Sequence, residues 1–262
     1  MSELLKIETL SKHFGGVKAI NGFQLTLDEG KIYGLIGPNG AGKTTIFNVI
    51  TGIYEPTEGR ILFQGADISG KKPQDIAKMG IGRTFQNIRL FTKLSALQNV
   101  LLANHGLLSY GLFESTFRTK KFRSEEQKAI ENARYLLETV GLSEYEKSIA
   151  GSLPYGHQRK LEIARALALN PKLLLLDEPA AGMNVEESIG LVRFIQQIKE
   201  RFDVTILMIE HHMDVVFNLC DECTVLNFGT TIASGTPDEI KKNPEVIRAY
   251  LGEEAVEHAE GK

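Results

Sequence analysis

The chain has 262 residues, a formal net charge of −3 and 42% hydrophobic residues, with only two cysteines. This composition excludes wholesale disorder and a disulfide scaffold, and the near-neutral charge gives no global attraction to nucleic acid. No window approaches the ~18 consecutive apolar residues of a membrane-spanning helix, and the first residues lack a signal-peptide pattern, so we expect a cytoplasmic chain that reaches a membrane only through a partner.

The N-terminal part of the chain predicts short strands at residues 5–10, 23–27 and 59–63, where apolar and β-branched residues are punctuated by Gly and Asp. Residues 31–37 predict a buried strand that runs into a glycine-rich turn. The segment 44–51 then predicts a helix.

The middle of the chain, residues 92–170, predicts mainly helices. Ser124, with Gln127 three residues later, has the spacing of a capping box and predicts the start of a helix. Apolar residues then recur every three or four positions as far as Val140, and Gly141 ends the helix.

The C-terminal third returns to alternating strands and helices. Residues 173–176 are all apolar, which is typical of a strand buried on both faces of a parallel sheet. Residues 186–201 predict an amphipathic helix, 204–209 a second buried strand, and 224–233 a hairpin. The last residues, 253–262, form a polar tail.

A complete phosphate-binding motif follows the strand predicted at 31–37. It consists of Gly37, Pro38, Asn39, Gly40, Ala41, Gly42, Lys43 and Thr44. Glycines let the backbone turn tightly, so that successive N–H groups and the helix N-terminus form a cradle for phosphates. Lys43 would place a positive charge on the β- and γ-phosphates, and the Thr44 hydroxyl is a ligand suited to Mg²⁺. Thr45 is expected as a further nucleotide contact.

Two carboxylates stand where the apolar strand at 173–176 ends. Ligands of parallel sheets bind outside the carboxyl ends of the strands, so this position suits a site. Asp177 would hold Mg²⁺ directly or through water, and Glu178 would orient and polarise the attacking water.

Further motifs surround these two. Gln86 (in RTFQN) and residues 153–160 (LPYGHQRK) precede the acidic strand; residues 180–184 (AAGMN) and His211 (in IEHH) follow it. Phe14 stands before a Gly-Gly pair near the N-terminus. In chain order these segments resemble the A-loop aromatic residue, Q-loop glutamine, signature motif, D-loop and switch histidine of ABC ATPases.

The resemblance to ABC ATPases covers residues 4–252 and implies one domain of the α/β class with the P-loop NTPase fold. It implies a nucleotide-binding core at 4–91 and 171–252, with an N-terminal antiparallel β subdomain. An inserted α-helical subdomain at 92–170 would carry the signature motif.

Several segments are similar to one group of this family, the ATP-binding subunits of branched-chain amino-acid importers of the LivG type. They are the Tyr-Gly core of the signature, the AAGMN and RTFQ segments, the insert at 104–123 and the VLNFG…IASGTP segment. The resemblance implies ATP hydrolysis that drives solute import. The implied partners are transmembrane permease subunits, a sister ATP-binding subunit or a second copy, and indirectly a solute-binding protein. The implied location is peripheral, on the cytoplasmic face of the membrane.

The family's roles can be carried to matching positions. Phe14 and Val17 are expected at the adenine of ATP, and Gln86 and His211 at its γ-phosphate, with His211 holding Glu178. The implied catalytic residues are Lys43, Gln86, Glu178 and His211, and the implied Mg²⁺ ligands are Thr44, Gln86 and Asp177.

The signature segment departs from the family's LSGGQ pattern. Pro154 replaces Ser and removes both a hydroxyl and an N–H, while Tyr155 replaces Gly and His157 replaces Gln. In this family two cassettes face each other head to tail, so Tyr155, Gly156 and His157 are expected to contact the ATP of the facing cassette. Gly156 is the strongest candidate of the three.

Other functions stay open at this point. The solute could be another polar molecule or a lipid-like export substrate, or the altered signature could leave catalysis dependent on a sister subunit. An ABC ATPase acting on DNA or ribosomes would carry a long coiled-coil insertion or two cassettes, which this sequence does not show.

Two residue pairs resemble metal-binding spacings without supporting a metal site. Cys220 and Cys223 form a C-x-x-C with no second pair, so we interpret them as small apolar residues. His211 and His212 are adjacent and should point apart, so we expect one functional and one surface histidine.

Overall fold

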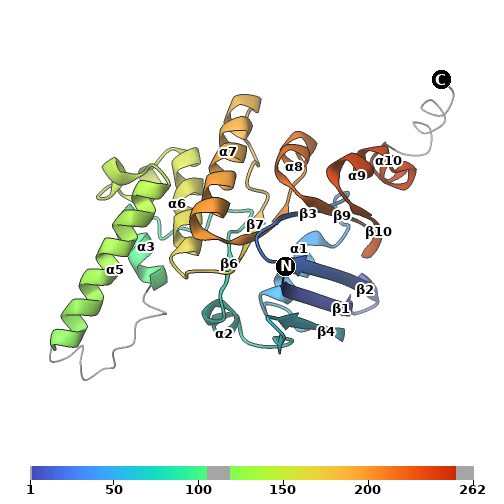
Figure 1. Ribbon diagram of the computed structural model, residues 1–262, viewed down its shortest axis with the longest axis horizontal. Helices are drawn as coiled ribbons and strands as arrows, with labels where there is room; N and C mark the ends of the chain where they lie inside the picture. The colour runs from blue at the N-terminus through green and yellow to red at the C-terminus, as the bar shows by residue number, and fades with distance from the viewer. Residues whose placement is uncertain (1, 105–118, 252–262) are drawn as a thin grey trace. The chain divides into compact units, whose positions relative to one another are not determined.

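The computed structural model describes residues 2–104 and 119–251. The predicted tail at 253–262 and most of the predicted insert at 104–123 therefore lie outside the described residues. The chain divides into two units, Met1–Ile76 with Leu175–Lys262, and Ala77–Leu174 (Figure 1). Each unit is treated separately below.

Strands predominate near the N-terminus and alternate with helices after residue 170. The strands are β1 (Glu3–Phe14), β2 (Val17–Asp28), β3 (Ile32–Ile36), β4 (Glu58–Phe63), β5 (Ala66–Asp67), β6 (Ile81–Arg83), β7 (Leu173–Asp177), β8 (Thr205–Ile209), β9 (Glu222–Asn227) and β10 (Thr230–Gly235). The helices are α1 (Lys43–Ile50), α2 (Pro73–Lys78), α3 (Ala96–Asn104), α5 (Lys120–Thr139), α6 (Tyr155–Leu167), α7 (Val185–Phe202), α8 (Met213–Leu219), α9 (Pro237–Lys242) and α10 (Pro244–Leu251).

The first unit contains an antiparallel sheet with the strand order β2-β1-β4-β5. Leu5 of β1 pairs with Leu27 of β2 on one side and with Phe63 of β4 on the other, and all three side chains are buried. Buried and exposed residues alternate from Phe23 to Leu27 of β2, as the two-residue period of a strand with one buried face requires. This sheet is the antiparallel β subdomain that the family resemblance implies.

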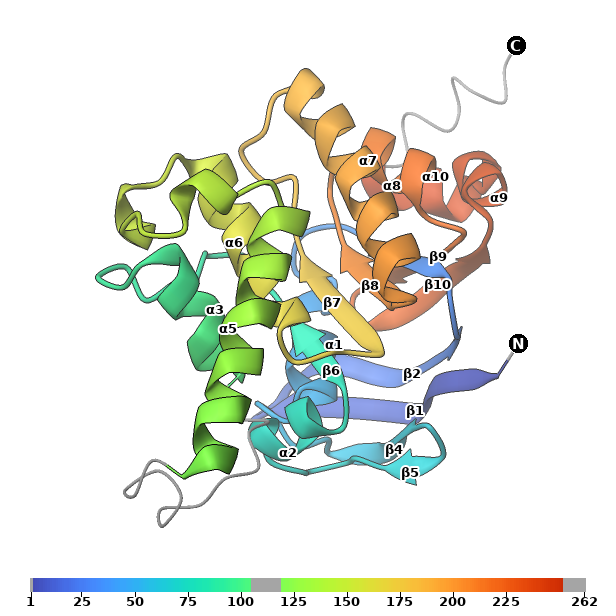
Figure 2. The ribbon, with the colours of Figure 1, turned by 60° about the vertical axis from the view of Figure 1, so that its left-hand side comes forward.

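The larger sheet of the first unit has the order β10-β9-β3-β8-β7. β3 runs parallel to both β8 and β9, and every residue of β3, β7 and β8 is buried. The continuous apolar sequences of these strands follow from burial on both faces. The helices α7 and α8 lie beside each other in this unit (Figure 2). Because β3, β7 and β8 lie side by side in this sheet, the segments that follow their carboxyl ends meet at one edge.

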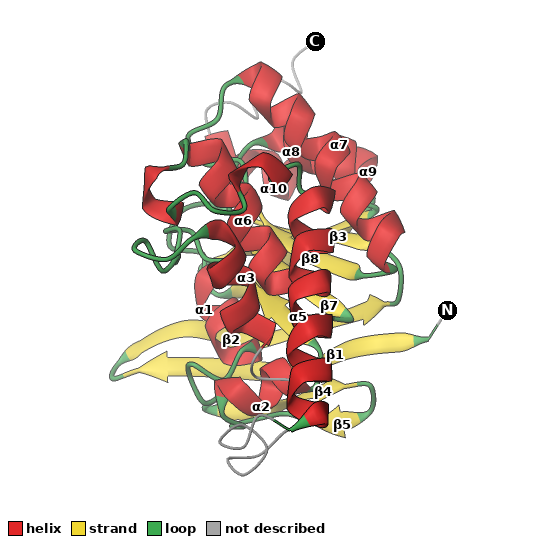
Figure 3. Cartoon of the chain, turned by 90° about the vertical axis from the view of Figure 1, so that its left-hand side faces the viewer, coloured by secondary structure: helices red, strands yellow, loops and turns green. Residues whose placement is uncertain are grey.

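The second unit is mainly helical. Helices α3, α5 and α6 pack against one another, and Figure 3 shows them as neighbours. Buried Ala133, Leu136 and Leu137 line the packed face of α5. At the edge of this unit the peptide N–H groups of Lys172 and Leu173 donate to the carbonyl of Gly80, just before β6.

The predicted start of the long helix at Ser124 is wrong. Helix α5 begins at Lys120, and the Thr119 side chain caps it by accepting a hydrogen bond from the N–H of Phe122 at 3.3 Å. The four residues before Ser124 have no helix-breaking Pro or Gly, so the helix extends back to the first residue with a capping hydroxyl. The predicted end is confirmed, since Gly141 follows the helix with φ of 70°.

Three further sequence expectations on the fold agree with the structure. The class is α/β, and β9 and β10 form the predicted hairpin around Gly229. The predicted amphipathic helix is α7, and it begins with a capping box between Asn184 and Glu187. Within the described residues, no helix combines the length and the apolar character that a membrane crossing requires.

The position of the α5 cap can be tested with two matched substitutions. Thr119→Ala removes the capping hydroxyl and should lower the free energy of unfolding by about 1 kcal/mol. Ser124→Ala replaces a mid-helix serine with the best helix former and should leave stability unchanged or slightly higher. Urea denaturation of both variants measures the difference, and a larger loss for Ser124→Ala would contradict the observed cap.

Candidate functional site

The glycine-rich loop after β3 has a backbone that only glycine permits. Gly37 and Gly42 have φ of 146° and 104°, in the region that L side chains rarely adopt. A Cβ on Gly37 would lie 2.1 Å from the carbonyl oxygen of Leu226, and one on Gly42 would lie 2.6 Å from that of Ala19. At Gly40 a Cβ would meet no atom within 4 Å, so this glycine borders open space. The loop is therefore packed tightly on one side and open on the other, as a phosphate cradle must be.

Lys43, the first residue of α1, is the cation of this loop. Only 5% of it is exposed, and its Nζ donates to the carbonyl oxygens of Gly37 at 2.6 Å and Pro38 at 2.9 Å. Burial lowers the pKa of Lys43, while the carboxylates of Glu178 and Asp177 act in the opposite direction. A polyanion bound in the loop would stabilise the charged form of Lys43 and so offset the effect of burial.

The other loop residues are arranged around Lys43 with different exposure. Asn39 and Thr44 are exposed, Pro38 and Thr45 are half-buried, and Ala41 is buried. The hydroxyl-bearing residues that the sequence assigned to nucleotide and Mg²⁺ contacts are thus accessible, while Ala41 packs into the core.

The acidic pair lies at the end of β7. Asp177 is 1% exposed and is the last residue of the strand. Glu178 follows in the left-handed conformation with φ of 48°, and its N–H donates to the carbonyl oxygen of Ile209 at 2.9 Å. Non-glycine residues adopt this conformation at a cost of order 1 kcal/mol, and such residues cluster at functional sites.

The side chain of Glu178 contacts His211, 33 residues further along the chain. The Oε1 of Glu178 lies 2.5 Å from the Nε2 of His211, in a contact that is 13% exposed on the glutamate side and 36% on the histidine side. The two residues follow the neighbouring strands β7 and β8. The structure therefore brings together a carboxylate and an imidazole, the pair of groups that moves protons in many active sites.

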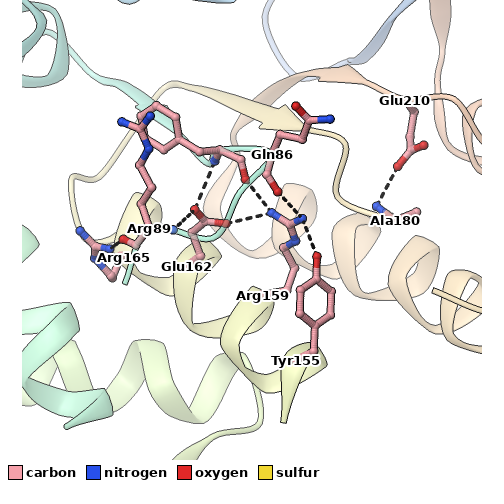
Figure 4. Close-up of polar contacts among 9 residues, drawn as sticks. Gln86, Arg89, Tyr155, Arg159, Glu162, Arg165, Ala180 and Glu210 are labelled. Atoms are coloured by element: carbon pink, nitrogen blue, oxygen red, sulfur yellow. Dashed lines mark hydrogen bonds and ion pairs between the residues drawn. The ribbon is translucent and has the colours of Figure 1, made fainter. Parts of the chain in front are cut away.

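Glu210, which the sequence analysis missed, joins the loops that follow β7 and β8. It is 1% exposed, and its Oε1 accepts the N–H of Ala180 at 2.7 Å (Figure 4). Its Oε2 accepts the N–H groups of His211 at 2.7 Å and His212 at 3.0 Å, and lies 3.1 Å from the Nδ1 of His212. One buried carboxylate therefore fixes both loops. The only available sequence signal was a charged residue directly after a run of buried apolar residues.

The two adjacent histidines point to different partners, as their neighbouring positions predicted. His211 contacts Glu178, whereas His212 contacts Glu210. Among the described residues, no group of three or more His, Cys, Asp or Glu side chains has an arrangement suited to a metal ion. Cys220 and Cys223 are both buried free thiols.

An aromatic pair lies near the predicted adenine position. Phe14 is 42% exposed, and its ring meets that of Tyr54 edge-on with centroids 5.1 Å apart. The Nζ of Lys12 lies 5.1 Å from the Phe14 centroid and 5.9 Å from that of Tyr54. Val17, three residues after Phe14, is 67% exposed. The sequence analysis found Phe14 and Val17 but gave no role to Lys12 or Tyr54.

The remaining candidate residues belong to the second unit. Gln86 is exposed in the loop after β6, and Tyr155 and Gly156 are exposed at the first turn of α6. Pro154 is the residue before α6 and gives the helix no side-chain cap. His157 is half-buried, and its ring lies against that of Tyr145 with centroids 4.8 Å apart. The exposed start of a 13-residue helix is a position suited to binding an anion.

Substitution of Glu210 tests its role as the link between the two loops. Glu210→Ala leaves the N–H groups of Ala180, His211 and His212 without their acceptor and should lower the free energy of unfolding by about 3 kcal/mol. Glu222→Ala removes a glutamate whose ion pair with Lys31 is 45% exposed on the glutamate side, and should cost about 0.5 kcal/mol. Chemical denaturation measures both values. Equal losses in the two variants would contradict the assignment.

Comparison with known proteins places the chain in a family. A family model described as "ABC transporter" matches residues 20–181, and one described as "Branched-chain amino acid ATP-binding cassette transporter" matches residues 230–256. The chain is 45% identical to the high-affinity branched-chain amino acid transport ATP-binding protein BraF of Pseudomonas aeruginosa over 250 residues, which are 95% of this chain and 98% of that protein. It is 46% identical to LivG of Escherichia coli K12, with the same coverage.

The structure agrees with this assignment. It is similar to the crystal structure of the ADP conformation of an ATP-binding cassette from an ABC transporter, with a TM-score of 0.83 and 34% identity. The match covers 97% of this chain and all of that one. The phosphate loop and the carboxylates at 177–178 lie within the segment 20–181 that the first family model matches, whereas His211 lies between the two matched segments. The chain therefore belongs to the ABC transporter family, as an ATP-binding cassette.

Proposed function

We propose that the chain hydrolyses ATP and uses this reaction to drive the import of a solute through separate membrane subunits. The observation that carries the proposal is the 2.5 Å contact between Glu178 and His211, in the same unit as the buried ammonium of Lys43. A carboxylate, an imidazole and a phosphate-binding cation are the groups that hydrolysis of a phosphoanhydride requires.

ATP would bind with its phosphates in the glycine-rich loop. The N–H groups of the loop and the start of α1 provide hydrogen-bond donors, and Lys43 contributes a positive charge to the β- and γ-phosphates. The carbonyls of Gly37 and Pro38 hold Lys43 at the loop before any ligand arrives. Little reorganisation of this cation is then needed on binding.

The oxygen donors of Thr44 and Asp177, both in the first unit, fit Mg²⁺. The Thr44 hydroxyl and the Asp177 carboxylate are hard oxygen donors, and the amide oxygen of Gln86 is the third ligand in this proposal. Asp177 is buried, and a buried carboxylate is best tolerated beside a cation. When bound, the ion would neutralise charge that develops on the phosphates.

The hydrolytic step would use Glu178 and His211 together. Glu178 accepts a proton from the water that attacks the γ-phosphate, and this carboxylate is oriented by its strained backbone and by the Nε2 of His211. His211 is in turn fixed by the hydrogen bond from its own N–H to Glu210. Glu210 is thus a positioning residue, since it holds the backbone that carries His211.

Two cassettes would complete each ATP site. The exposed Tyr155 and Gly156 at the start of α6 would face the γ-phosphate bound by the other cassette, where the positive end of the helix dipole favours an anion. His157 would lie next to them. The facing cassette is a sister subunit or a second copy of this chain.

The transported solute is proposed from the relatives. BraF and LivG are branched-chain amino acid transport proteins, and the second matching family model carries the same description. We infer a branched-chain amino acid as the solute, with another polar solute as the alternative. The chain would act peripherally at the cytoplasmic face of the membrane, with a solute-binding protein as an indirect partner.

The membrane subunits would dock on the second unit. This unit has a groove of about 610 Å³ between the loop after β6 and the helices α3 and α6. Its lining combines the apolar side chains of Leu90 and Phe91 with the charges of Arg89, Glu162 and Arg165. An amphipathic segment of a permease is suited to such a groove. Because Gln86 lies in the same loop, docking there would connect ATP binding to the permease.

Glu178→Gln tests the hydrolytic assignment. The variant keeps the shape of the side chain but cannot accept the proton, so ATP turnover should fall at least about 100-fold while MgATP still binds. Glu186→Gln changes an exposed glutamate of α7 and should retain parental turnover. Phosphate release gives the rates, and light scattering gives the mass with and without MgATP.

The outcomes of this experiment separate the possibilities. Dimerisation of Glu178→Gln with MgATP would support a sandwich of two copies of this chain. Parental turnover in Glu178→Gln would rule out Glu178 as the base. A parent that neither hydrolyses ATP nor dimerises would point to a required sister subunit.

The adenine contact can be followed with a single introduced tryptophan, because the chain has no Trp. Phe14→Trp should change its emission when MgATP binds, since the base would stack on the indole. Magnesium tripolyphosphate, which has the phosphates but no base, should bind without this change. An equal response to both ligands would contradict base stacking at residue 14.

A further inference from the structure

Helix α6 contains a buried ion pair that has no role in the proposed hydrolytic step. Arg159 and Glu162 are 1% and 3% exposed, and the Nη1 of Arg159 lies 3.0 Å from the Oε2 of Glu162. By contrast, the ion pair between Arg134 and Glu146 in the same unit has an arginine side chain that is 55% exposed. A fully buried pair of this kind is costly to desolvate unless further hydrogen bonds satisfy it.

Arg159 meets this requirement with the loop that follows β6. Its Nη1 donates to the carbonyl oxygen of Phe85 at 2.7 Å, and its Nη2 donates to that of Gln86 at 3.1 Å. The Nη2 also donates to the hydroxyl of Tyr155 at 3.2 Å. One guanidinium therefore joins the backbone of the Gln86 loop to the first residue of α6 (Figure 4).

Glu162 holds the same loop from its donor side. Its Oε1 accepts the N–H groups of Phe85 and Arg89, both at 3.2 Å. Burial raises the pKa of Glu162, while the Arg89 N–H and the Arg159 guanidinium act in the opposite direction. Nearby, Arg165 of α6 donates to the carbonyl oxygen of Arg89. Residues 85–89 thus have both carbonyls and N–H groups bound to a single helix.

Hydrophobic residues of similar volume often stabilise a protein core as well as a buried ion pair does. What they cannot do is bind specific backbone donors and acceptors of a neighbouring loop. The arrangement around Arg159 and Glu162 therefore points to positioning of the loop, because four hydrogen bonds run from this pair to the backbone of residues 85–89.

We propose that Arg159 and Glu162 form a clamp that makes the Gln86 loop and the signature turn of α6 move as one body. This inference rests on the proposed function, in which Gln86 serves the ATP of its own cassette and the signature turn meets the ATP of the facing one. Contact of the signature turn with the facing ATP is then transmitted through Arg159 to Gln86. Arg159 and Glu162 are positioning residues, since neither needs to touch ATP.

The clamp itself can be tested without nucleotide by amide hydrogen exchange. Arg159→Lys keeps the charge but loses the planar fork that reaches two carbonyls and a hydroxyl. Glu162→Gln keeps the shape but removes the charge. Exchange at the amides of Phe85 and Arg89 should rise at least about 10-fold in both variants, as expected when charged hydrogen bonds are weakened.

The matched control is Arg134→Lys, which alters the exposed ion pair with Glu146 in the same unit. Exchange at Phe85 and Arg89 should stay at the parental rate in this variant. Amides of buried Leu136 and Leu137 in α5 report whether each variant is folded. Should Arg159→Lys fail to fold, Tyr155→Phe removes a single hydroxyl partner of Arg159 and should raise the mobility of residues 155–158 relative to 85–89.

Transmission is tested by adding MgATP in a Glu178→Gln background, which should retain bound ATP. In the Glu178→Gln single variant, MgATP should increase the protection of the amides of both segments, 155–158 and 85–89. In the double variant Glu178→Gln/Arg159→Lys, the segment 155–158 should still gain protection. The gain in protection of 85–89 should fall by at least half. A full response of 85–89 in that variant would overturn transmission through Arg159.

The two arms separate failure of this inference from failure of the proposed function. The clamp would be overturned if Arg159→Lys and Glu162→Gln, without nucleotide, exchanged the amides of Phe85 and Arg89 at the parental rate. This conclusion would hold whatever the result of the MgATP experiment. If MgATP leaves exchange at 155–158 unchanged in the Glu178→Gln single variant, this result would instead count against the sandwich of two copies. The experiment without nucleotide would still show whether the clamp exists.

Discussion

The ammonium of Lys43 is a charge that the fold buries before any ligand is bound. Its two acceptors, the carbonyls of Gly37 and Pro38, belong to a loop whose backbone requires glycine. Burial makes the charged form less favourable and lowers the pKa of Lys43, although the carboxylates of Glu178 and Asp177 act in the opposite direction. The glycine conformations, the close approach of the loop to Leu226 and the position of β3 all serve to hold this cation in place.

Buried carboxylates also fix loops in both units. Glu210 binds backbone N–H groups after β7 and β8 in the first unit, and Glu162 binds those of residues 85–89 in the second. In each case one side chain, from the residue after β8 in the first unit and from α6 in the second, fixes loops that carry functional residues. A carboxylate suits this task because it accepts several hydrogen bonds at once, and charged hydrogen bonds to backbone N–H groups are stronger than neutral ones.

Much of the fold was predictable because local sequence and tertiary environment agree. The apolar strand β7, the amphipathic helix α7 and the hairpin of β9 and β10 each have the period or turn residues that their final positions demand. The prediction failed at the start of α5, where a Ser-x-x-Gln spacing is compatible with the middle of a helix as well as with its beginning. A capping motif shows that a helix could begin at that residue. It does not show whether the residues before it are also helical.

By itself, the sequence determined the chemistry that is consecutive along the chain: the glycine-rich loop with Lys43, the carboxylates at 177–178 and the family to which these motifs belong. Spacing carries this information because each such motif is built by one turn between a strand and the next element. Only the tertiary structure revealed that Glu178 meets His211 and that Glu210 and the Arg159–Glu162 pair hold their loops. These contacts join residues brought together by strand order and helix packing, and neither periodicity nor spacing along the chain encodes which distant N–H or carbonyl group a buried charge will reach.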